Sequence, residues 1–118
     1  MRVLFKLVVV CLFVFGCNQE SSQIQFFTHE GCPYCEKAMQ YIKINYPKLS
    51  MQVLEVDKGD NLKLFVRCAS KFKLNKDKLG TPLICMGDNY IMGWSKENQK
   101  LFNEYVKPFI EKQKVLKN

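Results

Sequence analysis

The spacing between apolar residues along this 118-residue chain changes several times, and each change marks the start of another predicted helix or strand. The uncharged run Ile24–Thr28 fits a strand that is buried on both faces. From Cys35 onward, apolar residues recur three or four positions apart as far as Tyr46, which predicts a helix that ends before Pro47. Alternation then returns over Met51–Asp57 and predicts a second strand.

The second half of the chain predicts another helix, a hairpin and a final helix. Helical spacing follows Asp60 and Asn61, either of which can cap it; the apolar positions are Leu62, Phe65, Ala69 and Phe72, with Cys68 beside them. The turn residues Gly87-Asp88-Asn89 join two short apolar runs, as in a β-hairpin. Ser95 can cap the last helix, which Pro108 should kink or restart. The expected order is β-α-β-α-β-β-α, with the first two strands parallel.

Arg2 and Lys6 supply two positive charges near the start of the chain, and an unbroken apolar run, Leu7–Phe15, follows them. This layout is typical of an export signal, and the run is shorter than the roughly 20 residues of a transmembrane helix. Val14-Phe15-Gly16-Cys17 resembles the bacterial lipobox, which implies that Cys17 is lipidated and becomes the new N-terminus. We therefore expect a signal peptide over residues 1–16, a polar tether over 17–23 and one domain over 24–118. A plain cleaved signal, an uncleaved anchor and a buried strand are the alternatives for the leader.

The expected location is the cell envelope, periplasmic or otherwise outside the cytoplasm, with the domain attached to the membrane through the lipid or the signal. The chain carries 18 basic and 11 acidic side chains, a formal charge of +7, and its densest basic cluster is Lys71–Lys78. No basic motif is interleaved with aromatic residues, so nucleic acid is not expected as a partner. The lysines fit a solvated face, which an anionic membrane could meet.

The main chemical signal is Cys32-Pro33-Tyr34-Cys35, between the first strand and the first helix. At a helix N-terminus, unpaired N–H groups and the positive end of the helix dipole stabilise a thiolate, here that of Cys32. Cys35, three residues later, can resolve a mixed disulfide by forming an internal bond. Lys37 could favour the thiolate, and His29 could do the same or shuttle a proton, although His29 also fits an exposed turn residue.

Four cysteines fall in the expected domain, an even number that an exported protein can accommodate. Cys68 and Cys85 each lie in an apolar element, so we expect two buried free thiols, with a second disulfide as the alternative. For Cys32 and Cys35, the alternatives to redox chemistry are a static disulfide or half of a zinc site. No further ligands stand at suitable spacing, so no metal site is predicted.

Together these features resemble the thioredoxin superfamily, and glutaredoxins most closely. The resemblance covers residues 24–110 and rests on residues 27–35 with their Cys-Pro-Tyr-Cys tetrapeptide, Thr81-Pro82, Gly87-Asp88-Asn89 and Gly93-Trp94-Ser95. It implies an α/β fold in which helices flank a central four-stranded mixed sheet. It also implies that Cys32 is the nucleophile, Cys35 the resolving thiol and Pro82 a cis-proline. Tyr34, Thr81, Pro82 and Gly93 would then bind the thiol substrate.

The chain departs from the glutaredoxin pattern at positions that matter for glutathione. His29 stands where many glutaredoxins have a lysine, and Met92-Gly93-Trp94-Ser95-Lys96 matches the usual Gly-Gly segment only in part. Phe26 stands where thioredoxins carry a buried acid. We therefore expect a monomeric thiol–disulfide oxidoreductase that acts on protein thiols, with its own dithiol as the redox group. The alternatives are a glutathione-dependent glutaredoxin, a Cu(I)- or Zn-delivery module that uses Cys32 and Cys35, and a scaffold whose motif serves only protein docking.

Overall fold

The computed structural model describes residues 23–117, and the expected signal peptide and lipidation site at Cys17 lie outside them. The strands are β1 (Ile24–Thr28), β2 (Met51–Glu55), β3 (Leu83–Met86) and β4 (Asn89–Met92). The helices are α2 (Pro33–Asn45), α3 (Asn61–Lys71), the short 3-10 helix η1 (Lys76–Lys78), α4 (Lys96–Tyr105) and α5 (Lys107–Lys117). None of the helices within residues 23–117 is both long and apolar enough to cross a membrane.

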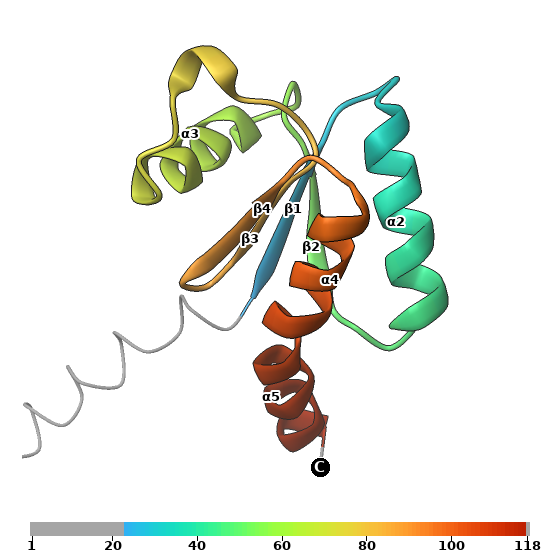
Figure 1. Cartoon of the computed structure of the whole chain (residues 1–118). Coiled ribbons are helices and arrows are strands. Elements are labelled where there is room, and N and C mark those ends of the chain that lie inside the picture. The colour runs from blue at the N-terminus through green and yellow to red at the C-terminus, as the bar shows by residue number, and fades with distance from the viewer. Residues whose placement is uncertain (1–22, 118) are drawn as a thin grey trace, which may run out of the picture.

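The four strands form one mixed sheet in the order β2-β1-β3-β4 (Figure 1). β1 and β2 are parallel, and β3 is antiparallel to both β1 and β4. β2 ends at Glu55, two residues before the predicted end, because Glu55 lies opposite Thr28, the last residue of its partner β1. Gly87 and Asp88 connect β3 to β4; Gly87 takes the positive φ of +66° that a tight hairpin requires.

Helices cover both faces of the sheet, with α2 and α4 on one side and α3 on the other (Figure 1). Phe26 points into the core beneath α2 and α4, where it is fully buried with Ile84 and Phe102. Its neighbour Phe27 points to the opposite face and packs with Phe65 of α3. An uncharged strand is thus required here because successive side chains enter two different cores.

The buried face of α3 differs in part from the sequence-based expectation. Phe65, Cys68 and Ala69 are buried, whereas Leu62 is 57% exposed. At about 100° per residue, the buried face centres between Phe65 and Cys68, which leaves Leu62 at its edge in the first turn. Asp60 occupies the N-cap position, but its side chain makes no capping hydrogen bond.

The C-terminal helical region follows its sequence signals. The Ser95 hydroxyl accepts a hydrogen bond from the Asn98 N–H at 3.1 Å and so caps α4. Val106 separates α4 from α5, and Pro108 lies in the first turn of α5, where its missing N–H costs no helical bond. The predicted restart of the helix at this proline is confirmed.

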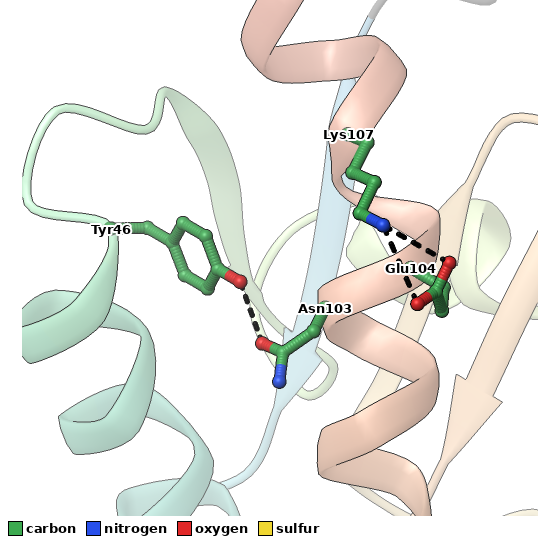
Figure 2. Close-up of polar contacts among 4 residues, drawn as sticks. All are labelled: Tyr46, Asn103, Glu104 and Lys107. Atoms are coloured by element: carbon green, nitrogen blue, oxygen red, sulfur yellow. Dashed lines mark hydrogen bonds and ion pairs between the residues drawn. The ribbon is translucent and has the colours of Figure 1, made fainter.

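The end of α2 is attached to α4 through one side chain. Tyr41 and Tyr46 both donate hydroxyl hydrogen bonds to Oδ1 of Asn103, at 2.8 and 2.6 Å. Figure 2 shows the Tyr46 bond and, one helical turn further on, the ion pair of Lys107 with Glu104 across the break between α4 and α5. Burial, with the neighbouring Tyr41 as a second cause, raises the pKa of Tyr46 above its usual 10.0.

Candidate active site

Local geometry places Cys32 at the N-terminus of α2. Cys32 is the N-cap, with extended backbone at φ −97° and ψ 104°, and Pro33 takes the first helical position. Its Sγ accepts a hydrogen bond from the N–H of Cys35 at 3.1 Å. The sulfur thus stands in the place of a capping oxygen, where the N–H groups and dipole of α2 favour negative charge.

Cys32 and Cys35 form a disulfide, with their Cα atoms 5.2 Å apart. Cys32 is half-buried, whereas Cys35 is only 3% exposed and packs with Ala38 in the core beneath α2. An approaching sulfur can therefore reach Cys32 more readily than Cys35. The predicted division into an attacking and a resolving thiol requires such a difference, and that division stays a prediction.

The segment before β3 lies against the sulfur of Cys32. The Thr81–Pro82 peptide bond is cis, as the resemblance implied, and Pro82 is buried. Thr81 Oγ1 lies 3.5 Å from Cys32 Sγ and can donate a hydrogen bond to it. The carbonyl oxygen of Thr81 is 3.6 Å from the same sulfur, so it can accept the proton of a reduced Cys32 thiol.

The loop after β4 is hydrogen-bonded to the cis-proline. Gly93 has φ +83°, a conformation that favours glycine, and its N–H donates to the carbonyl of Pro82 at 2.8 Å. The Asn98 side chain donates to the carbonyls of Met92 and Gly93, each at 3.0 Å. Sequence reasoning missed Asn98; its signal is the third position after the Ser95 cap, where side chains reach back to the preceding loop.

The chain matches no protein-family model and no curated protein. Among solved structures it is similar to the crystal structure of a glutaredoxin from Archaeoglobus fulgidus, with a TM-score of 0.53 and 19% sequence identity. The match covers 70% of this chain and 87% of that chain. The fold is thioredoxin-like, of the glutaredoxin type. The α/β fold predicted from the sequence is therefore confirmed.

Three other predicted site residues lie on the surface of this glutaredoxin-type domain. Tyr34 is 55% exposed, and the ammonium of Lys37 sits 5.7 Å from its ring centre. His29 is exposed, and its Nδ1 is 2.8 Å from the carbonyl oxygen of Glu30, to which it can donate. The structure thus brings Cys32, Cys35 and Thr81 together, while Lys37 contacts Tyr34 and His29 contacts Glu30.

Trp94, which follows Gly93 in the chain, packs against aromatic side chains of α2 and α4. It is half-buried, and its ring lies 5.6 Å from that of Tyr41 and 6.1 Å from that of Phe102, between α2 and α4. These aromatic contacts hold the loop that carries Gly93 onto the helical layer.

The second cysteine pair corrects a sequence-based expectation. Cys68 of α3 and Cys85 of β3 are not free thiols but form a disulfide, with their Cα atoms 6.5 Å apart. Both are buried, at 6% and 7% exposure, on the face of the sheet that α3 covers. The pairing follows because Cys85 alternates with Ile84 on β3 and so points to α3, away from the Cys32 side.

Within residues 23–117, no three or more His, Cys, Asp or Glu side chains gather in a way that could hold a metal ion. Cys32 and Cys35 themselves offer a metal ion two sulfur ligands. Zn²⁺ in a structural site takes four ligands, so these two sulfurs would need ligands from a partner.

Proposed function

We propose that this protein is a thiol–disulfide oxidoreductase that exchanges protein disulfides through Cys32 and Cys35, tethered to a membrane in the cell envelope. The observation that carries the proposal is the environment of one sulfur. Half-buried Cys32 caps α2, is bonded to buried Cys35, and lies against Thr81 and the cis-proline. These contacts suit a sulfur that alternates between thiolate, mixed disulfide and internal disulfide.

Reduction of a substrate would proceed in two exchanges. The Cys32 thiolate attacks one sulfur of the substrate disulfide, so a Cys32–substrate bond forms and the other substrate sulfur leaves as a thiolate. Cys35 then loses its proton and attacks Sγ of Cys32. This closes the internal disulfide and releases the second substrate thiolate, and two electrons pass from the dithiol to the substrate. Oxidation of a reduced substrate is the same sequence in reverse.

Two observations support protein substrates. Tyr34 exposes 55% of its surface next to the cysteines and offers an apolar contact to a polypeptide. His29, at the position where glutaredoxins commonly place a lysine for glutathione, is bonded to the Glu30 carbonyl.

The second disulfide supports the proposed location. Cys68 and Cys85 are joined although neither belongs to the redox motif. Structural disulfides persist mainly in compartments outside the cytoplasm. This agrees with the apolar leader Leu7–Phe15 and with the lipobox-like sequence that ends at Cys17.

The proposal is tested by the turnover of the full chain with insulin as substrate and dithiothreitol as reductant. Cys32→Ser should abolish turnover, and Cys35→Ser should accumulate mixed disulfides with the substrate. The double variant Cys68→Ala/Cys85→Ala controls for the general loss of a disulfide and should keep its turnover while folded. Equal turnover of Cys32→Ser and the parent would refute the proposal.

The metal-delivery alternative is tested by anaerobic titration with Cu(I) or Zn²⁺, in which metal binding by the parent is compared with that by Cys32→Ser/Cys35→Ser.

A further inference from the structure

An apolar groove opens at the end of the domain farthest from the redox motif. Tyr46, Pro47 and Leu49 form one wall, in the loop between α2 and β2, and Ile110 of α5 contributes to the other. Its volume is about 270 Å³, and its walls are almost wholly apolar. We refer to it as the foot groove, since its lining residues belong to the loop after α2 and to α5, which Figure 1 shows at the same end of the domain.

The foot groove is held open by hydrogen bonds within the domain. Gln113 of α5 bonds to both backbone groups of Ser50: its Nε2 donates to the carbonyl and its Oε1 accepts from the N–H, each at 2.9 Å. On the loop side, the Tyr46 hydroxyl is fixed by Asn103 (Figure 2). The two walls are therefore positioned without a ligand.

The residues that line the groove, and those next to them in the chain, include lysines and exposed apolar side chains. Lys48 and Lys114 are exposed and line it. Ile44, in the last turn of α2, is 77% exposed, and Val115, near the end of α5, is 74% exposed. Glu111 is the exposed acid on this part of α5. Apolar side chains flanked by lysines are typical of surfaces that lie on anionic lipid headgroups.

The first strand, β1, begins at this same end of the domain. Ile24, the first residue of β1, lies opposite Met51, which directly follows Ser50 beside the groove. Six residues, Asn18–Gln23, separate Cys17 from Ile24, and six residues can span at most about 20 Å. An anchor at Cys17 would therefore keep the foot groove close to the bilayer. Cys32 would point away from it, at the other end of the 13-residue helix α2, about 20 Å in length.

We propose that the foot groove and its lysines dock on an anionic lipid surface and orient the domain with Cys32 away from the membrane. This rests on the tethering in the proposed function but not on the redox chemistry. The test uses the full chain on vesicles of phosphatidylcholine, with and without phosphatidylglycerol. The leader should attach the chain to both kinds of vesicle, and the readout is confined to segments of the domain. The measurement is amide hydrogen exchange over residues 46–50 and 110–114.

Exchange in both segments should slow by about tenfold when phosphatidylglycerol is present, and salt should reverse the effect. Lys48→Glu/Lys114→Glu should remove this protection. The matched control Lys76→Glu/Lys78→Glu, with the same charge change on exposed residues of η1, should keep it.

Equal exchange on both kinds of vesicle, or full protection in Lys48→Glu/Lys114→Glu, would overturn the proposal. Slow exchange of both segments in detergent without vesicles would overturn it as well. If that protection rises with protein concentration, a second copy of the chain covers the groove; if it does not, residues 1–22 cover it. Insulin turnover of the same preparations separates the two proposals. Loss of lipid-dependent protection with normal turnover contradicts docking alone, whereas turnover that survives Cys32→Ser contradicts the redox function.

Discussion

The sulfur of Cys32 lies near two groups that can donate a hydrogen bond to it. The N–H of Cys35 is 3.1 Å away and belongs to the first turn of α2, and the hydroxyl of Thr81 is 3.5 Å away. Hydrogen bonds to a charged group stabilise that charged form over the neutral one. The reactivity of Cys32 should therefore depend on a residue 49 positions away in the sequence as well as on its own helix.

The variant Thr81→Val removes the hydroxyl while it keeps the branched shape of the side chain. In the reduced protein, less Cys32 should be thiolate at neutral pH, so alkylation of Cys32 by iodoacetamide should slow by about fivefold, the equivalent of one hydrogen bond. Thr81→Ser keeps the hydroxyl and should react at close to the parent rate. An unchanged rate in Thr81→Val would mean that the hydroxyl does not act on the sulfur.

At the scale of elements, the disulfide between α3 and β3 stabilises the layer opposite the active site. The bond joins residues 17 positions apart, and η1 lies in the segment it closes. A cross-link of this length removes conformational freedom from the unfolded chain. It also ties α3 to the strand that begins directly after the cis-proline.

Replacement of Cys68 and Cys85 by alanine should lower the free energy of unfolding by about 3 kcal/mol. Urea unfolding under oxidising conditions measures it. Cys32→Ala/Cys35→Ala is the control: it opens a much shorter loop, with a separation of three residues, and should cost about 2 kcal/mol. A stability of Cys68→Ala/Cys85→Ala equal to that of the parent would contradict a stabilising role for this bond.

Tyr46 joins α2 to α4, and its titration should make the free energy of unfolding depend on pH in the alkaline range. The pKa of Tyr46 is raised, so the folded protein holds this proton more tightly than the unfolded chain does. The corresponding stability is present below pH 10 and is lost as the pH rises through the folded pKa.

Tyr46→Phe should reduce the free energy of unfolding at neutral pH by about 1 kcal/mol, because the hydrogen bond to Asn103 is lost. Above pH 10 the difference from the parent should shrink. Urea unfolding at neutral and alkaline pH checks both statements, and Tyr105→Phe, at a half-buried tyrosine of α4, is the control. A difference that is constant with pH would show that Tyr46 does not titrate with folding.

At the scale of the whole molecule, Cys32 and the start of β1 at Ile24 lie near opposite ends of α2. Cys32 caps the first turn, and the loop after Tyr46 leads to Met51, which pairs with Ile24. The arrangement suits an enzyme that is held at a surface and presents its reactive sulfur to partners in solution.

The predictable parts of this fold are those that depend on short stretches of sequence. The proline after Cys32 marks the start of α2, the Gly87 turn marks the hairpin, and Pro108 marks the restart between α4 and α5. The order of elements followed from these local signals. The sequence pattern could not give the end of β2, because that end depends on the length of its partner β1.

The parts of the site that sequence reasoning missed depend on contacts between distant segments. The Cys68–Cys85 bond requires that α3 and β3 turn the same faces toward each other, and spacing within each element does not determine this. The contact of Thr81 with Cys32 was not predicted: the resemblance to glutaredoxins implied only that Thr81 binds the thiol substrate, and nothing near Thr81 in the chain indicates Cys32 as a partner. Asn98 was missed because a polar residue in a first helical turn commonly faces solvent.

The most direct test of the central claim, that Cys32 is the attacking sulfur, is the alkylation of the fully reduced chain. A short pulse of iodoacetamide at neutral pH, followed by mass spectrometry of the peptides, gives the rate at each cysteine. Cys32 should react at least about tenfold faster than Cys35, because it caps α2 and is the more exposed of the two. Equal rates, or faster modification of Cys35, would contradict the assignment.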